Sequence, residues 1–219
     1  MSNSQKNEPP GAPARTAQLT DPHALRAYAH PTRMRLVGLL RTEGPFTATR
    51  AAELTGESVA SCSYHLRMLA KYGLVEVAPG GQGREKPWRA TARFTQWPNY
   101  SEDPAVAEAS RALETAVAER YFELITRAIE ERHDLPREWQ EAEHIGDQVL
   151  YLTAEELADL GEKLDRLLRP YEDRQGDPAA RPQGVRLVQI VRAAFPLPQR
   201  PGAGNEETSI APDSAGGPR

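Results

Sequence analysis

Residues 58–77, SVASCSYHLRMLAKYGLVEV, contain a helix start, a helix stop and the beginning of a strand. Ser58 belongs to the residue types that cap helix N-termini, and Gly73 is the residue that most readily ends a helix. Apolar residues spaced three, four and three apart predict one buried stripe on a helix running to about Tyr72: Val59, Cys62, Leu66 and Leu69. The apolar run LVEV that follows predicts a strand.

The opposite side of this helix is polar. It carries Ala60, Ser63, Tyr64, Arg67 and Lys71, with Ser61 at the margin. Hydroxyl groups, an aromatic ring and two cations on an exposed face suit a helix that lies in a DNA major groove. The Arg67 side chain could make a bidentate contact to guanine or a contact to phosphate, and its position alone favours neither.

Capping and helix-breaking residues also divide the flanking sequence. Asp21-Pro22, His30-Pro31 and Thr47 mark three helix starts, whereas Gly44-Pro45 and Gly56 mark helix ends. The expected helices cover 23–29, 32–40 and 48–55, and strands at 74–78 and 88–94 flank a Gly-rich turn. Helix, helix, helix-turn-helix and hairpin is the order of a winged helix-turn-helix domain.

The stretches HPTRMRLVGLL, AAELTG and SVASCSYHLRMLAKYGLVEV resemble the ArsR-type winged helix family of bacterial transcriptional repressors, over roughly residues 19–97. The resemblance implies sequence-specific binding to double-stranded DNA as a homodimer, with repression relieved by a signal. It places the base-reading positions at Ser61, Ser63, Tyr64 and Arg67, and the wing cations at Arg84, Lys86 and Arg89. Phosphate contacts are expected from Thr47, Thr49 and Arg50, although Thr47 also serves as a helix cap.

Several residues invite a metal or redox interpretation. The family's metal sensors carry a Cys-x-Cys pair in the third helix, which the segment 48–56 lacks, so a member without a metal site is expected. Cys62 lies within the apolar stripe, which favours burial over redox chemistry. His65 is expected to be half-buried and to bond backbone or phosphate. An acid-His-His-acid pattern in the second half is interrupted by a proline and is interpreted as chance spacing: Glu131, His133, His144 and Asp147.

Charge divides the chain into two unlike halves. Residues 1–100 carry 13 Lys and Arg against 7 Asp and Glu, whereas residues 101–219 carry 14 against 24. A basic half joined to an acidic half favours a polyanion-binding module attached to a second unit. A single cysteine, no membrane-length apolar run and no signal-peptide pattern favour the cytoplasm.

The second half is predicted to hold a long helix and a small accessory unit. Asp103-Pro104 starts a helix to about Arg132, whose apolar stripe could pair two subunits or pack on the first helix. Beyond it, DQVLYL, a helix with a Thr153–Glu156 capping box, and VRLVQIVRAAF predict a strand, a helix and a strand. That unit could hold an effector pocket or brace an interface.

The predicted fold class is mainly α with small β: a winged helix-turn-helix domain, a long dimerisation helix and a small C-terminal α+β unit. The boundaries are a disordered arm at 1–18, the winged domain at 19–97, the long helix at 102–133, the α+β unit at 139–195 and a disordered tail at 196–219. The predicted function is a DNA-binding transcriptional regulator, with no catalytic, cofactor or metal site. A winged helix used only for protein contacts is the main alternative. An enzyme with its site in the acidic half is a further alternative, which no sequence motif supports.

Overall fold

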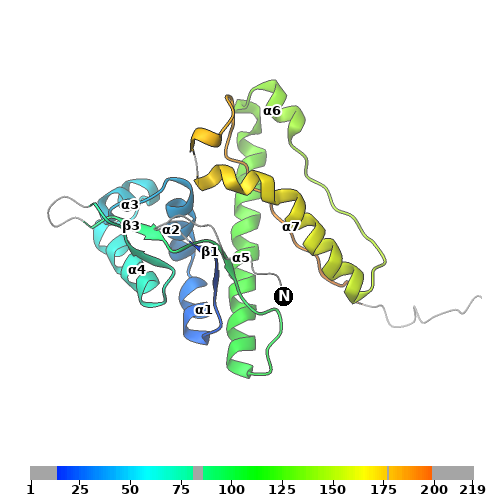
Figure 1. Ribbon diagram of the computed structural model, residues 1–219, viewed down its shortest axis with the longest axis horizontal. Coiled ribbons are helices and arrows are strands. Elements are labelled where there is room, and N and C mark those ends of the chain that lie inside the picture. Colours follow the sequence, from blue (N-terminus) through cyan, green and yellow to red (C-terminus); the bar gives the residue numbers. More distant parts are fainter. Residues whose placement is uncertain (1–13, 81–85, 177, 199–219) are drawn as a thin grey trace, which may run out of the picture.

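The computed structural model describes residues 14–80, 86–176 and 178–198 (Figure 1). The amino-terminal half forms a winged helix-turn-helix domain, and helices dominate the remainder. The elements of the first half are β1 Ala14–Gln18, α1 Pro22–Tyr28, α2 Pro31–Thr42, α3 Ala48–Thr55, α4 Val59–Lys71, β2 Val75–Val77, β3 Trp88–Ala90 and β4 Ala92–Gln96. The elements of the second half are α5 Pro104–Glu131, the short 3₁₀ helix η1 Arg132–Asp134, α6 Arg137–Ala142, α7 Ala154–Gly176 and the 3₁₀ helix η2 Pro178–Ala180.

The predicted helix starts and stops of the first half are confirmed. The side chain of Asp21 accepts a hydrogen bond from His23 N–H at the start of α1, and Thr47 and Ser58 cap α3 and α4 in the same way. Gly56 and Gly73 follow α3 and α4 with φ of 77° and 71°, in the left-handed region where glycine pays no steric penalty. Short polar side chains and glycines therefore fix the boundaries of the helix-turn-helix.

One apolar core holds the winged domain together. Its largest fully buried members come from α1, α2, α4 and α5 and from the position just before β2: Leu25, Leu36, Val37, Leu66, Leu69, Leu74 and Leu113. All described residues that are buried lie between Leu19 and Leu113. The core thus ends within the first half of α5, where the partly buried Ala116 and Val117 still pack against it.

Two small sheets flank the helices, and they correct two predictions. β2 and β3 form the expected antiparallel pair, but the strand predicted at 88–94 is divided at Thr91, whose hydroxyl donates to Gly73 O at 2.7 Å. β4 instead pairs in parallel with β1, within the arm predicted to be disordered over 1–18. The composition of residues 14–18 does not indicate a strand, because β1 forms only by pairing with β4, about eighty positions further along the chain.

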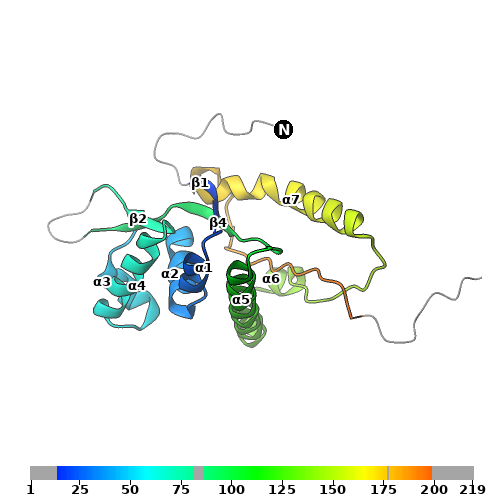
Figure 2. The ribbon, with the colours of Figure 1, turned by 90° about the horizontal axis from the view of Figure 1, so that it is seen from below.

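α5 confirms the predicted long helix, which runs the full height of the view in Figure 1 and is seen nearly along its axis in Figure 2. Asp103 caps it by accepting from Ala105 N–H at 2.8 Å. Val106, Ala109 and Leu113 are buried where α5 packs against α1, so the first part of the predicted stripe is satisfied within the chain. Further along, Phe122 and Ile129 are exposed.

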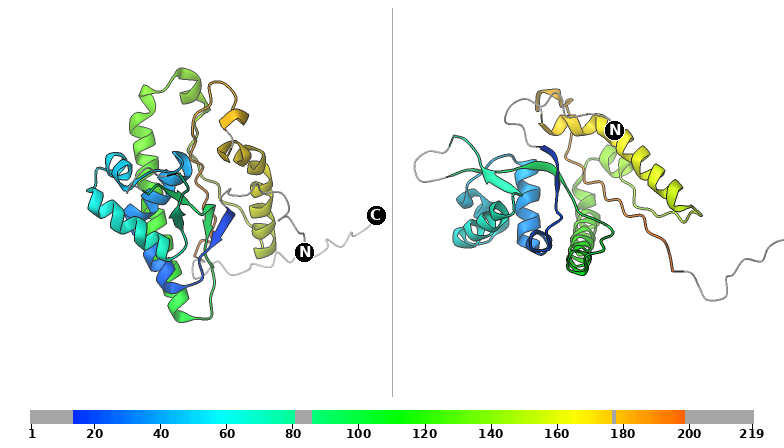
Figure 3. Two further views of the ribbon diagram at one scale, coloured as in Figure 1. Left: turned by 60° about the vertical axis from the view of Figure 1, so that its left-hand side comes forward. Right: turned by 60° about the horizontal axis from the view of Figure 1, so that its bottom comes forward.

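The region after α5 corrects the predicted α+β unit at 139–195. The capping box is confirmed, since Thr153 N–H donates to Glu156 at 2.7 Å and Glu156 N–H donates to Thr153 Oγ1 at 3.1 Å. The strands predicted at 147–152 and 185–195 are wrong: both segments are extended, but neither is in a sheet (Figure 3). A strand requires a hydrogen-bonded neighbour, and no backbone edge of the described chain pairs with either segment.

α7 is longer than expected and runs to Gly176, through a proline at position 170. In the described residues, we find no helix with the length and apolar character needed to cross a membrane.

Candidate nucleic-acid interface

The turn between α3 and α4 sets the position of the exposed helix face. Thr47 Oγ1 accepts from Arg50 N–H at 3.3 Å, and Ser58 Oγ accepts from Ser61 N–H at 3.1 Å, so both helix starts are capped. Gly56, between them, lets the chain reverse direction within three residues. α4 therefore lies against the core on one side and faces solvent on the other.

The solvent-facing side of α4 is the one predicted from the sequence. Ala60, Arg67 and Lys71 are exposed, Tyr64 is 54% exposed, and Ser63 is partly exposed. Val59, which was predicted in the buried stripe, is instead 47% exposed. It stands in the first turn of α4, where the helix has not yet reached the core.

Arg67 is held in a defined orientation on this face. Its Nε donates to the backbone oxygen of Ser63 at 3.1 Å, one turn earlier. Within the described part of the chain, its two terminal nitrogens have no hydrogen-bond partner, so the ends of the guanidinium remain open for a second molecule. Lys71, at the end of the helix, has its Nζ 5.3 Å from the centroid of the Tyr72 ring.

Ser61 has a different environment from the other candidate base-reading residues. Its hydroxyl donates to Glu57 at 2.5 Å, and the same carboxylate accepts from the Thr32 hydroxyl at 2.8 Å. Hydrogen bonds from Ser61 and then Thr32 lower the pKa of Glu57. Glu57 thereby ties the start of α2 to the start of α4. Sequence reasoning missed this role, although an acid four residues before Ser61 and next to a helix cap was a usable signal.

The buried side of α4 contains the residues that invited a redox or metal interpretation. Cys62 is fully buried, as predicted, and its Sγ lies 3.4 Å from the hydroxyl of Thr55 in α3. His65 is 9% exposed, more buried than predicted, and its ring centroid lies 4.6 Å from that of His30 at the start of α2. Burial, and next the positive charge of Arg33, lower the pKa of both imidazoles.

The remaining predicted contacts surround α4. Lys86 is exposed just before β3, and Arg89 of β3 forms an ion pair with Glu76 of β2, 2.7 Å away. Arg84 lies outside the described residues. In α3, Thr49 and Arg50 are exposed, and Arg50 pairs with Glu53 at 2.7 Å. The structure therefore groups the α4 residues on one face, and α4 is in contact with both α3 and the hairpin strand β2.

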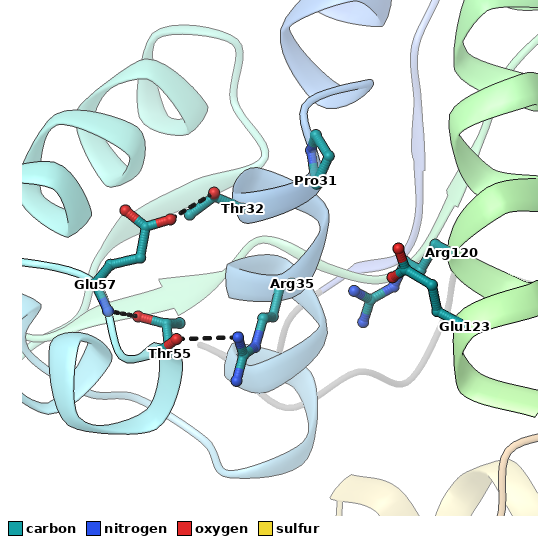
Figure 4. Close-up of a pocket in the computed structure, with 7 residues that line it drawn as sticks. All are labelled: Pro31, Thr32, Arg35, Thr55, Glu57, Arg120 and Glu123. Atoms are coloured by element: carbon teal, nitrogen blue, oxygen red, sulfur yellow. Dashed lines mark hydrogen bonds between the residues drawn. The ribbon is translucent and has the colours of Figure 1, made fainter. Parts of the chain in front are cut away.

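A polar pocket of about 190 Å³ lies behind the helix-turn-helix, between α2, the α3–α4 turn and α5 (Figure 4). Arg35 of α2 donates to the backbone oxygens of Thr55 and Leu54 at 3.0 and 2.9 Å, while Arg120 enters from α5. The lining residues are Pro31, Thr32, Arg35, Thr55, Glu57, Arg120 and Glu123. None of them belongs to the segment 139–195, where an effector pocket was considered from the sequence.

The acid-His-His-acid pattern does not form a cluster. His133 lies in η1, where its Nε2 is 3.3 Å from Asp134, and His144 follows α6. Over residues 14–80, 86–176 and 178–198, no group of three or more His, Cys, Asp or Glu side chains is placed to hold a metal ion.

Comparison with known proteins supports the domain assignment. Residues 28–78 match a family model described as a helix-turn-helix domain. Among solved structures, a homodimeric winged helix-turn-helix DNA-binding domain from Mycobacterium bovis, described as a possible ArsR-family transcriptional regulator, shares 20% identity over 58% of this chain and 85% of its own, with a TM-score of 0.30. A MarR family regulator from Neisseria meningitidis shares 16% identity over 68% and 75%, with a TM-score of 0.26.

No curated protein matches the chain. Both TM-scores are low, so the winged helix-turn-helix assignment rests on the matched segment and on the order of the elements.

Proposed function

We propose that this chain is a transcriptional regulator that binds double-stranded DNA through α4. The observation that carries the proposal is the exposed face of α4, where Ser63, Tyr64, Arg67 and Lys71 project from a helix whose other side is fixed in the core. A helix-turn-helix places such a face in the major groove, where side chains reach the edges of the bases.

The side chains on this face have different roles. Arg67 contacts guanine with its two open terminal nitrogens, and Ser63 and Tyr64 contact neighbouring bases or sugar. Lys71, Thr49 and Arg50 contact phosphates on either side and fix the register of the helix. Ser61 contributes mainly by its hydrogen bond to Glu57, which holds the start of α4 in place.

The hairpin of β2 and β3 supplies a second contact as the wing. Lys86 reaches the flanking backbone or minor groove, and Arg84, which lies outside the described residues, is a further candidate cation. Arg89 of β3 adds a third cation, which is ion-paired with Glu76. The basic charge of residues 1–100 favours this arrangement over a winged helix that binds only protein.

The finer function that we propose is that of an ArsR-like repressor that acts as a homodimer in the cytoplasm, without catalytic activity, cofactor or metal. A small-molecule effector would release it from DNA. The pocket of Figure 4 is a suitable place, because its Glu57 is hydrogen-bonded to both α2 and α4. A ligand that altered those bonds would shift the recognition helix.

Selection from a pool of random duplexes tests the proposal. The full chain should enrich an imperfect inverted repeat with half-site centres about one helical turn, roughly 10 base pairs, apart. The double variant R67A/K71A should enrich nothing, whereas the matched variant R26A/R111A, altered at exposed arginines of α1 and α5, should enrich the same repeat. Failure of the unaltered chain to enrich any duplex at low salt would overturn the proposal.

A further inference from the structure

Beyond Val117, which still packs against the core, the described chain buries no side chain fully and exposes many large apolar ones. Fourteen of the twenty large hydrophobic residues that are exposed in the described chain lie between positions 145 and 197. They include Val149 and Tyr151 before α7, Leu167 within it, and Leu187 and Val188 after it. We call the apolar side chains of 145–152, α7 and 185–197 the C-terminal apolar surface.

The two extended segments that border α7 also leave their backbone unpaired. Both run from the α6 end of the molecule towards the start of α7 (Figures 1 and 3). The segment 185–195 is anchored at two points, since Arg186 lies over the Trp139 ring at 5.7 Å and Arg192 pairs with Asp165 of α7 at 2.8 Å. Within the described residues, no backbone hydrogen bond joins this segment to 145–152. Two strand-like edges are therefore open to another chain.

The sequence at either end of the described chain offers few apolar side chains that could cover this surface. The thirteen residues before β1 and the residues after 198 are rich in Pro, Gly, Ser, Asn and charged side chains, and the only large apolar ones among them are Met1 and Ile210. If each of the fourteen exposed residues presents roughly 100 Å², the set presents about 1,400 Å², compared with about 800 Å² per partner in a standard interface. An area of this size is comparable to that of an obligate dimer interface.

The charge pattern shows which molecule fits. The segment 145–152 carries Asp147 and no Lys or Arg, whereas 185–195 carries Arg186 and Arg192 and no acid. Arg192 is already paired with Asp165 of the same chain, so Asp147 and Arg186 are the charges that would meet between two copies. A surface that contains two oppositely charged strand edges is complementary to itself under a two-fold rotation, because each edge meets its opposite in the other copy. Residues 143–197 as a whole carry 10 Asp and Glu against 7 Lys and Arg, which disfavours nucleic acid and an anionic membrane.

We propose that the C-terminal apolar surface is the interface with a second copy of this chain, in which the segments 145–152 and 185–195 pair across the two-fold axis and form the sheet that one copy lacks. The inference rests on the homodimer of the proposed function and assigns its interface to the C-terminal region instead of to α5 alone. The two winged domains would then be held together from the side opposite their DNA-binding faces.

The test is the mass of the full chain in solution, by sedimentation and by light scattering on a sizing column. The unaltered chain should have twice its 24.2 kDa mass. Tyr151→Asp and Leu187→Asp each place a charge on one of the two segments and should weaken the dimer by at least about 30-fold, the size of an interface hot spot. Tyr151 and Leu187 are 104% and 73% exposed in the single chain, so neither change disturbs its core.

Tyr100→Asp is the matched control, because Tyr100 is 81% exposed but lies between β4 and α5, outside the segments that make up this surface. It should remain a dimer, and circular dichroism should show unchanged helix content in all three variants. A monomeric unaltered chain, or dimers of undiminished affinity in both Tyr151→Asp and Leu187→Asp, would overturn the inference. Because the masses are measured without DNA, they test the dimer interface separately from the proposed DNA binding.

Discussion

Replacing Arg67 with alanine should weaken DNA binding at one base pair of each half-site. In the structure, the bond from Nε to Ser63 O at 3.1 Å leaves both terminal nitrogens open, which is the geometry of a bidentate contact to guanine. Such a contact contributes about 1–3 kcal/mol of discrimination, so affinity for the cognate duplex should fall about 5- to 150-fold per half-site. Affinity for a duplex with that guanine already replaced should change far less.

Fluorescence anisotropy with both duplexes and both proteins gives the four dissociation constants. The matched control is Arg26→Ala, which removes an exposed arginine of α1 that pairs with Glu108 of α5, away from the DNA-binding face. Its affinities should equal those of the unaltered chain. A uniform loss on both duplexes for Arg67→Ala would show a phosphate contact, and the assignment of Arg67 to base reading would be refuted.

Three further predictions concern the wing, the core and the buried histidines. Lys86→Ala should weaken binding to all duplexes by the same factor. It should also reduce the slope of log affinity against log salt by about 0.9 per protomer, which a salt titration measures. A change confined to one sequence would argue against this phosphate contact. Leu66→Ala, at a fully buried site of α4, should lower the free energy of unfolding by about 2–5 kcal/mol in urea, and a loss below about 1 kcal/mol would contradict the packing. Burial lowers the pKa of His30 and His65 below 6.5, so the unfolded chain binds more protons than the folded chain. The free energy of unfolding should therefore fall as the pH drops through 6.5. His65→Gln should reduce this fall, and an unchanged pH profile would exclude the histidine pair as its source.

Local chemistry made the helix-turn-helix predictable. Ser58, Thr47 and Asp21 cap the helices they were expected to cap, and Gly56 and Gly73 end them, because each effect depends on residues within one turn. The exposed face of α4 followed from the same periodicity. Val59 was the exception, since burial in the first turn depends on where the helix meets the core.

Elements that depend on distant partners were predicted poorly. β1 was missed because its pairing edge is β4, at the other end of the domain. The link from Thr32 through Glu57 to Ser61 was missed for the same reason, since it joins two helices that only the fold brings together. The segments 147–152 and 185–195 have a strand-like composition, but a single copy of the chain offers them no sheet to join.

The central claim is that α4 reads DNA sequence, and one titration tests it most directly. The full chain is added to a labelled duplex from upstream of its own gene and to a scrambled duplex of equal composition, over a salt series. The account predicts tight binding to the upstream duplex alone, which weakens steeply as salt increases. Absence of binding to either duplex at low salt would contradict it, and would indicate that this winged helix binds protein instead.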